Sequence, residues 1–174
     1  AAPVLIDEDE SPWGISFLRM FDMTNDSDLT RTKDDLKEEE YRLQGNNRFI
    51  GGKKTYLPVY EGKMVETYDH RAATIVLTDN VSRAAQPKSI EPEKHKDPSF
   101  LPLPLHWIRK KHVDDRTPED WPYDWAAGFK RVTASTNHRT VVGPILPYSA
   151  ISYTLILVFT NVSRADLAAC LYAN

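Results

Sequence analysis

The chain has 174 residues with a formal net charge of −3, and 41% of its residues are hydrophobic and 27% charged. This composition is close to that of ordinary globular domains and excludes a wholly disordered chain. No apolar run approaches the roughly 20 residues of a membrane helix, and the single cysteine, Cys170, excludes an internal disulfide and a cysteine-based zinc site.

The acidic N-terminus, residues 1–10, carries no signal-peptide pattern. Together with the missing apolar run, this predicts a cytoplasmic protein with no membrane partner. Three Asn-x-Ser sequons, at Asn25, Asn80 and Asn161, are typical of secreted proteins, but so short a pattern also arises by chance.

The first predicted elements are a strand and an exposed helix. Residues 13–23 are apolar and rich in strand formers, which indicates a strand. A cluster of capping residues follows, and Ser27 or Asp28 is predicted to cap a helix that runs from Leu29 to about Glu40. The many charges in this stretch are typical of a helix with a solvated face.

Short strands and turns are predicted for the rest of the first half. They are a hairpin of strands 41–43 and 48–50 that ends at Gly51 and Gly52, a strand over 56–60, a helical turn over 61–67 and a strand over 72–77. Five prolines between 86 and 104 then predict a flexible loop. This loop is a possible boundary between two sub-lobes, 1–85 and 105–174, of a single module, 1–174.

The second half also consists mainly of predicted strands. An extended segment at 105–108 and an acidic aromatic turn at 118–125 lead to strands over 125–133, 140–145 and 153–159, and to a helix over 163–172. The sequence stops in this helix without the glycine or proline that commonly follows a helix end, so we expect a fragment of a larger protein. The predicted fold class is α+β and β-rich, with a mostly antiparallel sheet and a few short helices.

Charge is distributed unevenly along the chain. Residues 1–40 carry 12 acids and 4 bases, whereas residues 41–174 carry 13 acids and 18 bases. A basic body is one pattern of a nucleic-acid-facing surface. The basic residues gather in 109–112 and, at predicted strand ends, in 130–131 and 137–140, with the side-chain types that contact phosphates and base edges. Solvated turns and a solvated acidic helix are the alternative.

Little in the sequence indicates catalysis. It contains no Gly-rich phosphate loop, nucleophile elbow or metal-binding histidine spacing, so no catalytic residue and no metal site are predicted. Glu61-x-Lys63, at the end of a predicted strand, matches half of a Mg²⁺-dependent nuclease pattern. That chemistry also needs an upstream aspartate on an adjacent strand, whereas the candidates Asp34 and Asp35 lie on the predicted exposed helix.

Three blocks of residues occur in an order that is typical of one protein family. They are Pro-Trp-Gly to Met-Thr-Asn-Asp-Ser in 12–27, Leu-Pro-Val-Tyr-Glu-Gly-Lys-Met and Tyr-Asp-His-Arg in 57–71, and Gly-Phe-Lys-Arg-Val-Thr, Asn-His-Arg-Thr and Ile-Leu-Pro in 128–147. With these blocks the chain resembles the central, target-recognition segment of large adenine-N6 DNA methyltransferases of phage-defence systems. This family includes type IIG-like restriction–modification enzymes and related methylases. The chain departs from it at Lys130-Arg131, where Arg-Asp is usual, and in the Pro-rich segment 86–104.

The resemblance implies what this module does and what it lacks. In the family, a preceding Rossmann-like domain binds S-adenosylmethionine and carries an Asn-Pro-Pro-Tyr catalytic loop, and no Asn-Pro-Pro occurs in this chain. The resemblance therefore implies a non-catalytic, DNA-facing module without a cofactor of its own, in a parent that uses S-adenosylmethionine. Its implied partners are double-stranded DNA and its own methyltransferase domain. Because the catalytic domain must flip an adenine out of the duplex, a second surface is needed to hold the DNA in register.

Residue roles follow from the same resemblance. The expected DNA-binding residues are Lys63, Arg71, Arg109, Lys110 and Lys111 at phosphates, Asn137, Arg139 and Thr140 near bases, and Lys130 and Arg131 beside them. The alternative for the second block is a structural cluster of Glu61, Asp69 and His70, with Lys63 and Arg71, that braces the module. Two other functions stay open: an interdomain scaffold without DNA contact, which an acidic lead segment would suit, and a nuclease that uses Glu61-x-Lys63.

Overall fold

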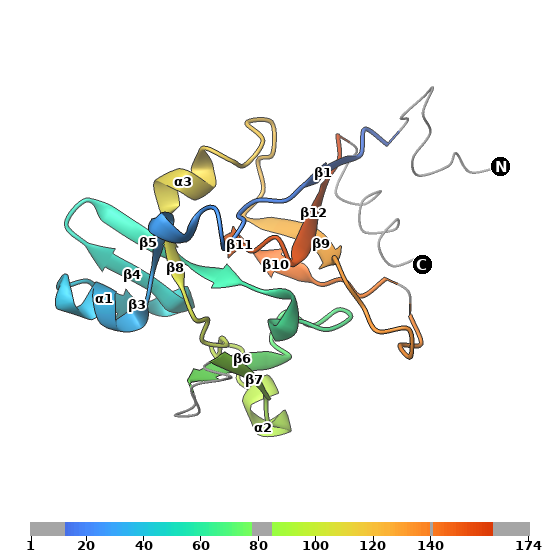
Figure 1. The fold of residues 1–174 in the computed structure, drawn as a ribbon, viewed down its shortest axis with the longest axis horizontal. Coiled ribbons are helices and arrows are strands. Elements are labelled where there is room, and N and C mark those ends of the chain that lie inside the picture. The colour runs from blue at the N-terminus through green and yellow to red at the C-terminus, as the bar shows by residue number, and fades with distance from the viewer. Residues whose placement is uncertain (1–12, 78–84, 140, 162–174) are drawn as a thin grey trace.

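Three β-sheets form the framework of the chain, whose computed structural model describes residues 13–77, 85–139 and 141–161 (Figure 1). The largest has the order β2 (Thr30–Arg31), β8 (Trp107–Arg109), β5 (Lys54–Tyr60), β4 (Arg48–Gly51) and β3 (Arg42–Gln44), and β11 (Ala150–Ile151) also pairs with β5. The second has the order β1 (Ser16–Leu18), β12 (Leu155–Phe159), β9 (Trp125–Lys130) and β10 (Ile145–Pro147). The third consists of β6 (Ala73–Leu77) and β7 (Ala85–Ser89).

The helices of the described residues are short. They are α1 (Lys33–Glu38), α2 (Pro92–His95) and α3 (Lys110–Asp114), with single 3₁₀ turns η1 (Ser27–Leu29), η2 (Gly45–Asn47) and η3 (Gly62–Met64). The strand pairs are antiparallel except for β5 with β11. The predicted class, α+β and β-rich with mostly antiparallel pairing and a few short helices, is therefore confirmed.

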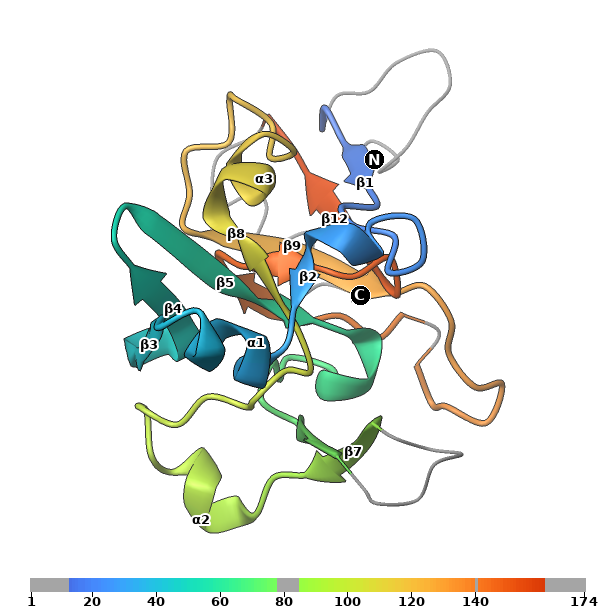
Figure 2. The same ribbon diagram turned by 60° about the vertical axis from the view of Figure 1, so that its left-hand side comes forward.

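Both larger sheets combine strands from distant parts of the sequence. Strand β8 lies between β2 and β5, and β1 pairs with β12. Segment 86–104 thus does not divide the sheets into an N-terminal and a C-terminal set. In both ribbon views α3 lies at one end of the molecule and the unit of β6, β7 and α2 at the other (Figures 1 and 2).

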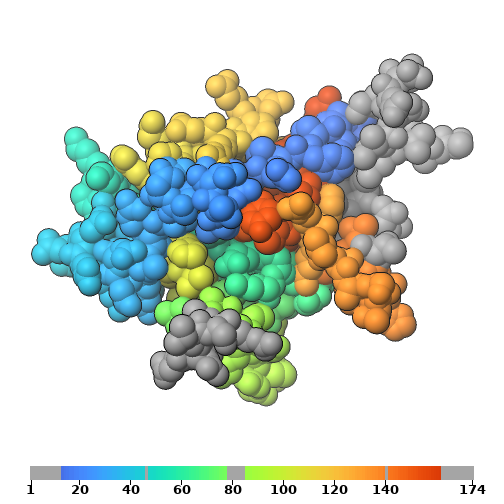
Figure 3. Space-filling model, viewed as in Figure 1, coloured from blue at the N-terminus to red at the C-terminus, as the bar shows by residue number. Residues whose placement is uncertain are grey.

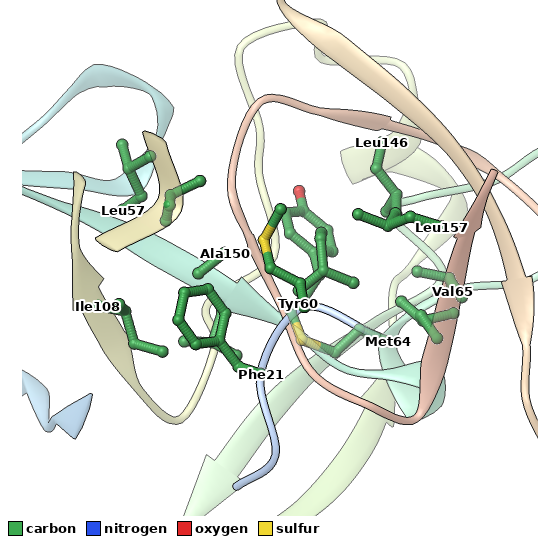
Figure 4. Close-up of a cluster of buried hydrophobic side chains, with 14 of the residues drawn as sticks. Phe21, Leu57, Tyr60, Met64, Val65, Ile108, Leu146, Ala150 and Leu157 are labelled. Carbon is green, nitrogen blue, oxygen red and sulfur yellow. The ribbon is translucent and has the colours of Figure 1, made fainter. Parts of the chain in front are cut away.

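The main core lies around the parallel pair of β5 and β11. Alternation along β12 directs Leu155, Leu157 and Phe159 into it, where they meet the apolar side chains of the two larger sheets (Figure 4). A smaller cluster lies on the opposite face of the largest sheet, because residues next to each other on a strand point to opposite faces. It consists of Leu36 from α1 packed with Phe49, Tyr56 and Trp107.

Helix α1 begins later than predicted, so the prediction of Ser27 or Asp28 as its cap is wrong. The Thr32 hydroxyl accepts the Asp35 N–H at 3.2 Å, and the Asp35 carboxylate accepts the Thr32 N–H at 2.8 Å. This reciprocal capping box fixes the first turn. Residues 30–31 are unavailable to the helix because they pair with β8.

The prediction of a loop throughout 86–104 is also wrong in part. Pro87 lies in β7 opposite Ile75, in a two-stranded sheet whose strands are both edges, where a missing N–H is tolerated. Pro92 is the first residue of α2, a position at which proline breaks no helical hydrogen bond.

Several predicted limits shift as well. The strand predicted over 13–23 is regular only at Ser16–Leu18, that over 125–133 ends at Lys130, and that over 140–145 is replaced by Ile145–Pro147. Helix α3 was not predicted. The helix predicted over 163–172 lies outside the described residues.

Candidate nucleic-acid interface

The loop that follows β9, residues 131–139, combines basic and polar side chains. It contains two arginines, a histidine, an asparagine, two threonines and a serine, and no aspartate or glutamate. Most of its residues are exposed. Figure 3 shows it in orange, projecting at the lower right and well away from the yellow residues of α3. The loop thus carries cations without an acid in the same segment, as does the longer stretch 41–60 with Arg42, Arg48, Lys53 and Lys54.

The start and the tip of this loop are held by backbone hydrogen bonds. The Arg131 N–H donates to the Thr154 carbonyl at 2.9 Å, and the Asn137 N–H donates to the Ala134 carbonyl at 3.0 Å. The Arg131 guanidinium lies over the Tyr153 ring, 5.5 Å from its centre. Such stacking restrains a guanidinium while its donors still face outward.

Tyr68 lies beside the loop in an unusual conformation. Its φ is +61°, a left-handed value that is rare for a bulky residue, and its N–H donates to the Gly143 carbonyl at 3.1 Å. The side chain is 51% exposed despite its size. Residues held in strained backbone conformations cluster at active sites, ligand clamps and switch regions.

Arg139 connects the loop to Tyr68. Its guanidinium lies 5.6 Å from the centre of the Tyr68 ring, and Nη1 is 3.5 Å from the Tyr68 hydroxyl. Below this pair is a hollow of about 70 Å³ whose lining includes Phe129, Val141 and Val158. It is smaller than the roughly 150 Å³ that holds a benzene ring, so it suits a small apolar group at most.

The outer face of the second sheet continues this surface with apolar side chains. Because Leu155 and Leu157 face the core, the alternate residues Ile156 and Val158 face outward, paired with Phe129 and Phe17. Phe17 is 50% exposed, and its ring meets that of Phe129 edge to face at 6.0 Å. Val132 and Val141, at the two ends of the loop, are 79% and 59% exposed.

Four of the other predicted DNA-binding residues form ion pairs with acids. The ion pairs are Lys63 with Glu61 at 3.2 Å, Lys110 with Asp114 at 2.6 Å, Lys111 with Asp115 at 3.6 Å, and Lys130 with Glu66 at 2.7 Å. Arg109 is half-buried beside Tyr56 at the end of β8 and makes no hydrogen bond or ion pair within the described residues. Thr140 lies outside the described residues.

Arg71 braces the backbone of its own neighbourhood. Its guanidinium donates to the carbonyls of His95 at 2.9 Å, Asp97 at 2.8 Å and Phe100 at 3.2 Å, which anchors the segment around α2. The Asp69 carboxylate accepts the Arg71 N–H at 2.7 Å and lies 3.8 Å from the His95 ring nitrogen. Arg71 and Asp69 thus share one structural unit, of the kind expected for a bracing cluster.

Among the described contacts, the remaining members of the predicted cluster, Glu61, Lys63 and His70, form no side-chain hydrogen bond or ion pair with Arg71 or Asp69. Burial, with help from the Arg71 charge, lowers the pKa of His70, whose ring lies 6.3 Å from the Tyr60 ring. Glu61 pairs with Lys63 instead of with Arg71.

The pieces of the nuclease pattern do not form a metal centre within the described residues. Burial lowers the pKa of His106, and Glu61 and Asp35 act on it as nearby negative charges. Asp35 is held by the capping box, and Glu61 by Lys63. The described part of the chain contains no group of three or more His, Cys, Asp or Glu side chains placed to hold a metal ion.

Sequence reasoning missed the central aromatic residue of this surface. Tyr68 was quoted as part of the second block but was given no role, because nothing local signals its positive φ or its contact with Arg139, 71 residues further on.

Comparison of the chain with protein-family models, with curated proteins and with solved structures finds no match. No helix among the described residues is long and apolar enough to cross a membrane.

Proposed function

We propose that the chain is a non-catalytic, DNA-facing module of an adenine-N6-specific DNA methyltransferase, and that it contacts double-stranded DNA through residues 131–139 and Tyr68. The observation that carries the proposal is the exposed loop with two arginines and no acids, set beside an exposed tyrosine. The parentage rests on the order of the three sequence blocks. The protein would act in the cytoplasm, and S-adenosylmethionine would be bound by the parent's catalytic domain.

The chemistry of the loop suits a duplex. Arginine forks match phosphate oxygens and the acceptor edge of guanine, and asparagine, serine and threonine donate to phosphates or bases. Stacking on Tyr153 and Tyr68 restrains Arg131 and Arg139 before DNA arrives, which lowers the ordering cost of binding. Asn137 lies at the exposed tip between the two arginines in sequence.

The proposal narrows the set of contact residues. Four lysines each have a carboxylate within 4 Å that offsets their charge: Lys63, Lys110, Lys111 and Lys130. The Arg71 guanidinium donates to three backbone carbonyls. We therefore assign Arg131, Asn137 and Arg139, and none of these five residues, to DNA contact.

Replacement of both loop arginines tests this assignment. In fluorescence anisotropy with a labelled duplex, R131A/R139A should bind about 30-fold more weakly than the unchanged chain, since each of the two contacts to DNA contributes on the order of 1 kcal/mol. The matched control is K110A/K111A, which removes the same charge from α3 and should change the affinity less than about twofold. Equal losses in the two variants would contradict the assignment to the loop.

One observation favours a second candidate, an interdomain scaffold that packs against the parent's methyltransferase domain. Phe17, Val132 and Val141 are exposed apolar side chains on or next to the outer face of the second sheet. Contiguous exposed apolar residues are typical of protein–protein contacts. A scaffold would bind no DNA, whereas F17S would weaken its association with a separately produced methyltransferase domain. The DNA-facing module predicts that F17S leaves duplex affinity unchanged.

A further inference from the structure

A cavity where β4, β5 and the turn before β11 meet has the features of a binding site. Its volume is about 150 Å³, and its lining includes Asn47, Arg48, Pro58, Tyr60, Tyr148 and Ser149. We infer that this cavity binds one planar heteroaromatic ring with both hydrogen-bond donors and acceptors, that is, a pyrimidine base or the six-membered ring of a purine base. The inference does not depend on the proposed function, because none of these residues belongs to the loop assigned to DNA.

The Tyr60 hydroxyl supplies the main evidence. The residue is only 2% exposed and lies among the apolar side chains of the core (Figure 4), yet its hydroxyl forms no hydrogen bond within the described residues. The hydroxyl oxygen is not among the described polar atoms that are enclosed without a partner. Since Tyr60 also lines the cavity, its hydroxyl is available to donate to a molecule bound there.

Arg48 provides a second set of unused donors. It is half-buried at the start of β4 and, within the described residues, makes no hydrogen bond or ion pair. A guanidinium has five N–H donors in a fixed plane, which suits the acceptor edge of a base. Two different side chains therefore offer unmatched donors to the same small space.

The corner next to Arg48 is held rigidly. Asn47 has a φ of +52°, and its amide nitrogen donates to the carbonyls of Leu101 at 3.3 Å and Pro102 at 2.8 Å. Its own carbonyl accepts the Trp107 indole N–H at 2.7 Å. The backbone that carries Arg48 is thus fixed from two sides, as expected of a preorganised site.

The walls and the size select a single ring. Pro58 and Tyr148 present flat faces, and the Tyr148 ring is positioned by its hydroxyl, which donates to Asp114 at 2.5 Å, and by Lys110, whose Nζ lies 5.4 Å from the ring centre. A cavity of about 150 Å³ accommodates a benzene-sized molecule, whereas drug-sized ligands need roughly 300 Å³ or more. A bare phosphate or carboxylate would leave the flat walls without contact.

Acceptors as well as donors line the cavity, which favours a base over an anion. The Ser149 hydroxyl uses its proton to donate to the Pro147 carbonyl at 2.7 Å, so toward a ligand it can act only as an acceptor. Asp124 also contributes to the lining. A ring with N–H or amino groups on one edge and acceptors on another can satisfy Arg48, Tyr60 and these oxygens together, as nucleobases do.

Titration with free nucleosides, followed by chemical-shift changes in NMR spectra, tests the inference. Adenosine, guanosine, cytidine and thymidine are each added to millimolar concentration, and at least one should shift the amide signals of residues 47–48, 60 and 148–149. In Y60F the same nucleoside should bind about five- to tenfold more weakly, because one hydrogen bond is lost while the ring packing stays. The matched control Y56F removes another buried tyrosine hydroxyl, from the smaller cluster, and should leave binding unchanged.

Two outcomes would overturn the inference: no shifts at these residues with any nucleoside, or the same shifts with inorganic phosphate alone. Should Y60F not fold, R48Q gives the same test from the second donor. A short single-stranded oligonucleotide that competes with the nucleoside would identify the ligand as a base within nucleic acid. Binding of free nucleosides without such competition would identify it as a free nucleoside. Either result is distinct from the loss of duplex binding in R131A/R139A.

Discussion

Replacing Arg116 by alanine should lower the free energy of unfolding by about 2–3 kcal/mol, less than the roughly 3–5 kcal/mol for breaking a fully buried ion pair, because the guanidinium is partly exposed. Arg116 forms a two-pronged contact with Asp26, at 2.7 and 2.8 Å, and also donates to the Met20 carbonyl at 2.6 Å. It lies 4.3 Å from the centre of the Phe21 ring. These contacts tie α3 and the turn after it to the chain that leads into η1, across 90 residues of sequence.

Chemical denaturation measures this effect against a control from the same helix. K111A removes an ion pair whose two side chains are 68% and 56% exposed, so it should change stability by less than about 0.5 kcal/mol. Similar losses in R116A and K111A would contradict the structural role of Arg116.

The contribution of Arg116 should also depend on pH. Its hydrogen bond to the Asp26 carboxylate lowers the pKa of that group in the folded chain. A carboxyl whose folded pKa is depressed contributes stability above its unfolded pKa, here 3.8, and loses that contribution as the pH falls through the lower folded value. The stability gap between R116A and the unchanged chain should therefore narrow below pH 3.8.

Replacing Gly143 by alanine should lower the free energy of unfolding by about 2–3 kcal/mol, because the added methyl group overpacks the site. A Cβ at this position would lie 2.4 Å from the Gly128 carbonyl oxygen, which belongs to the backbone of β9 and cannot turn aside. The carbonyl of Gly143 also accepts the N–H of Tyr68, so any shift of this segment displaces the tyrosine. We therefore expect G143A to weaken duplex binding as well as to lower the melting temperature.

Gly45 provides the control for this substitution. A Cβ at Gly45 would meet nothing within 4 Å, and the residue lies in an exposed 3₁₀ turn. G45A should leave stability within about 0.5 kcal/mol and duplex binding unchanged. If G143A were as stable as G45A, this result would contradict the close approach of Gly143 to the Gly128 carbonyl.

The elements that depend on local pattern could be predicted from the sequence. Strand β5, the hairpin of β3 and β4, and β12 are short apolar or turn-flanked runs, and each was found where it was expected. Helix α1 was misplaced because residues 30–31 are held by β8, about 75 residues away, which no local rule reveals. The prolines at 87 and 92 led to the prediction of a loop. A strand accepts Pro87 because it is an edge strand, and a helix accepts Pro92 because it is the first helical residue, and neither condition can be recognised from the local sequence.

The same distinction applies to the predicted site. The pairing of Lys110 with Asp114 follows helical spacing and is visible in the sequence, so the reduced charge of that cluster could have been anticipated. The pairing of Lys130 with Glu66 joins residues 64 apart, and the stacking of Arg139 on Tyr68 joins residues 71 apart. These contacts decide which cations remain for DNA, and they depend on the fold as a whole.

The central claim is that residues 131–139 and Tyr68 contact the phosphates and bases of a duplex. A salt series of fluorescence anisotropy measurements tests it most directly, because the slope of log affinity against log salt is roughly −0.9 per neutralised phosphate. The account predicts a slope of about −2 or steeper for the unchanged chain, and a slope shallower by about 2 for R131A/R139A. No binding at about 50 mM salt, or a slope that the double variant leaves unchanged, would contradict it.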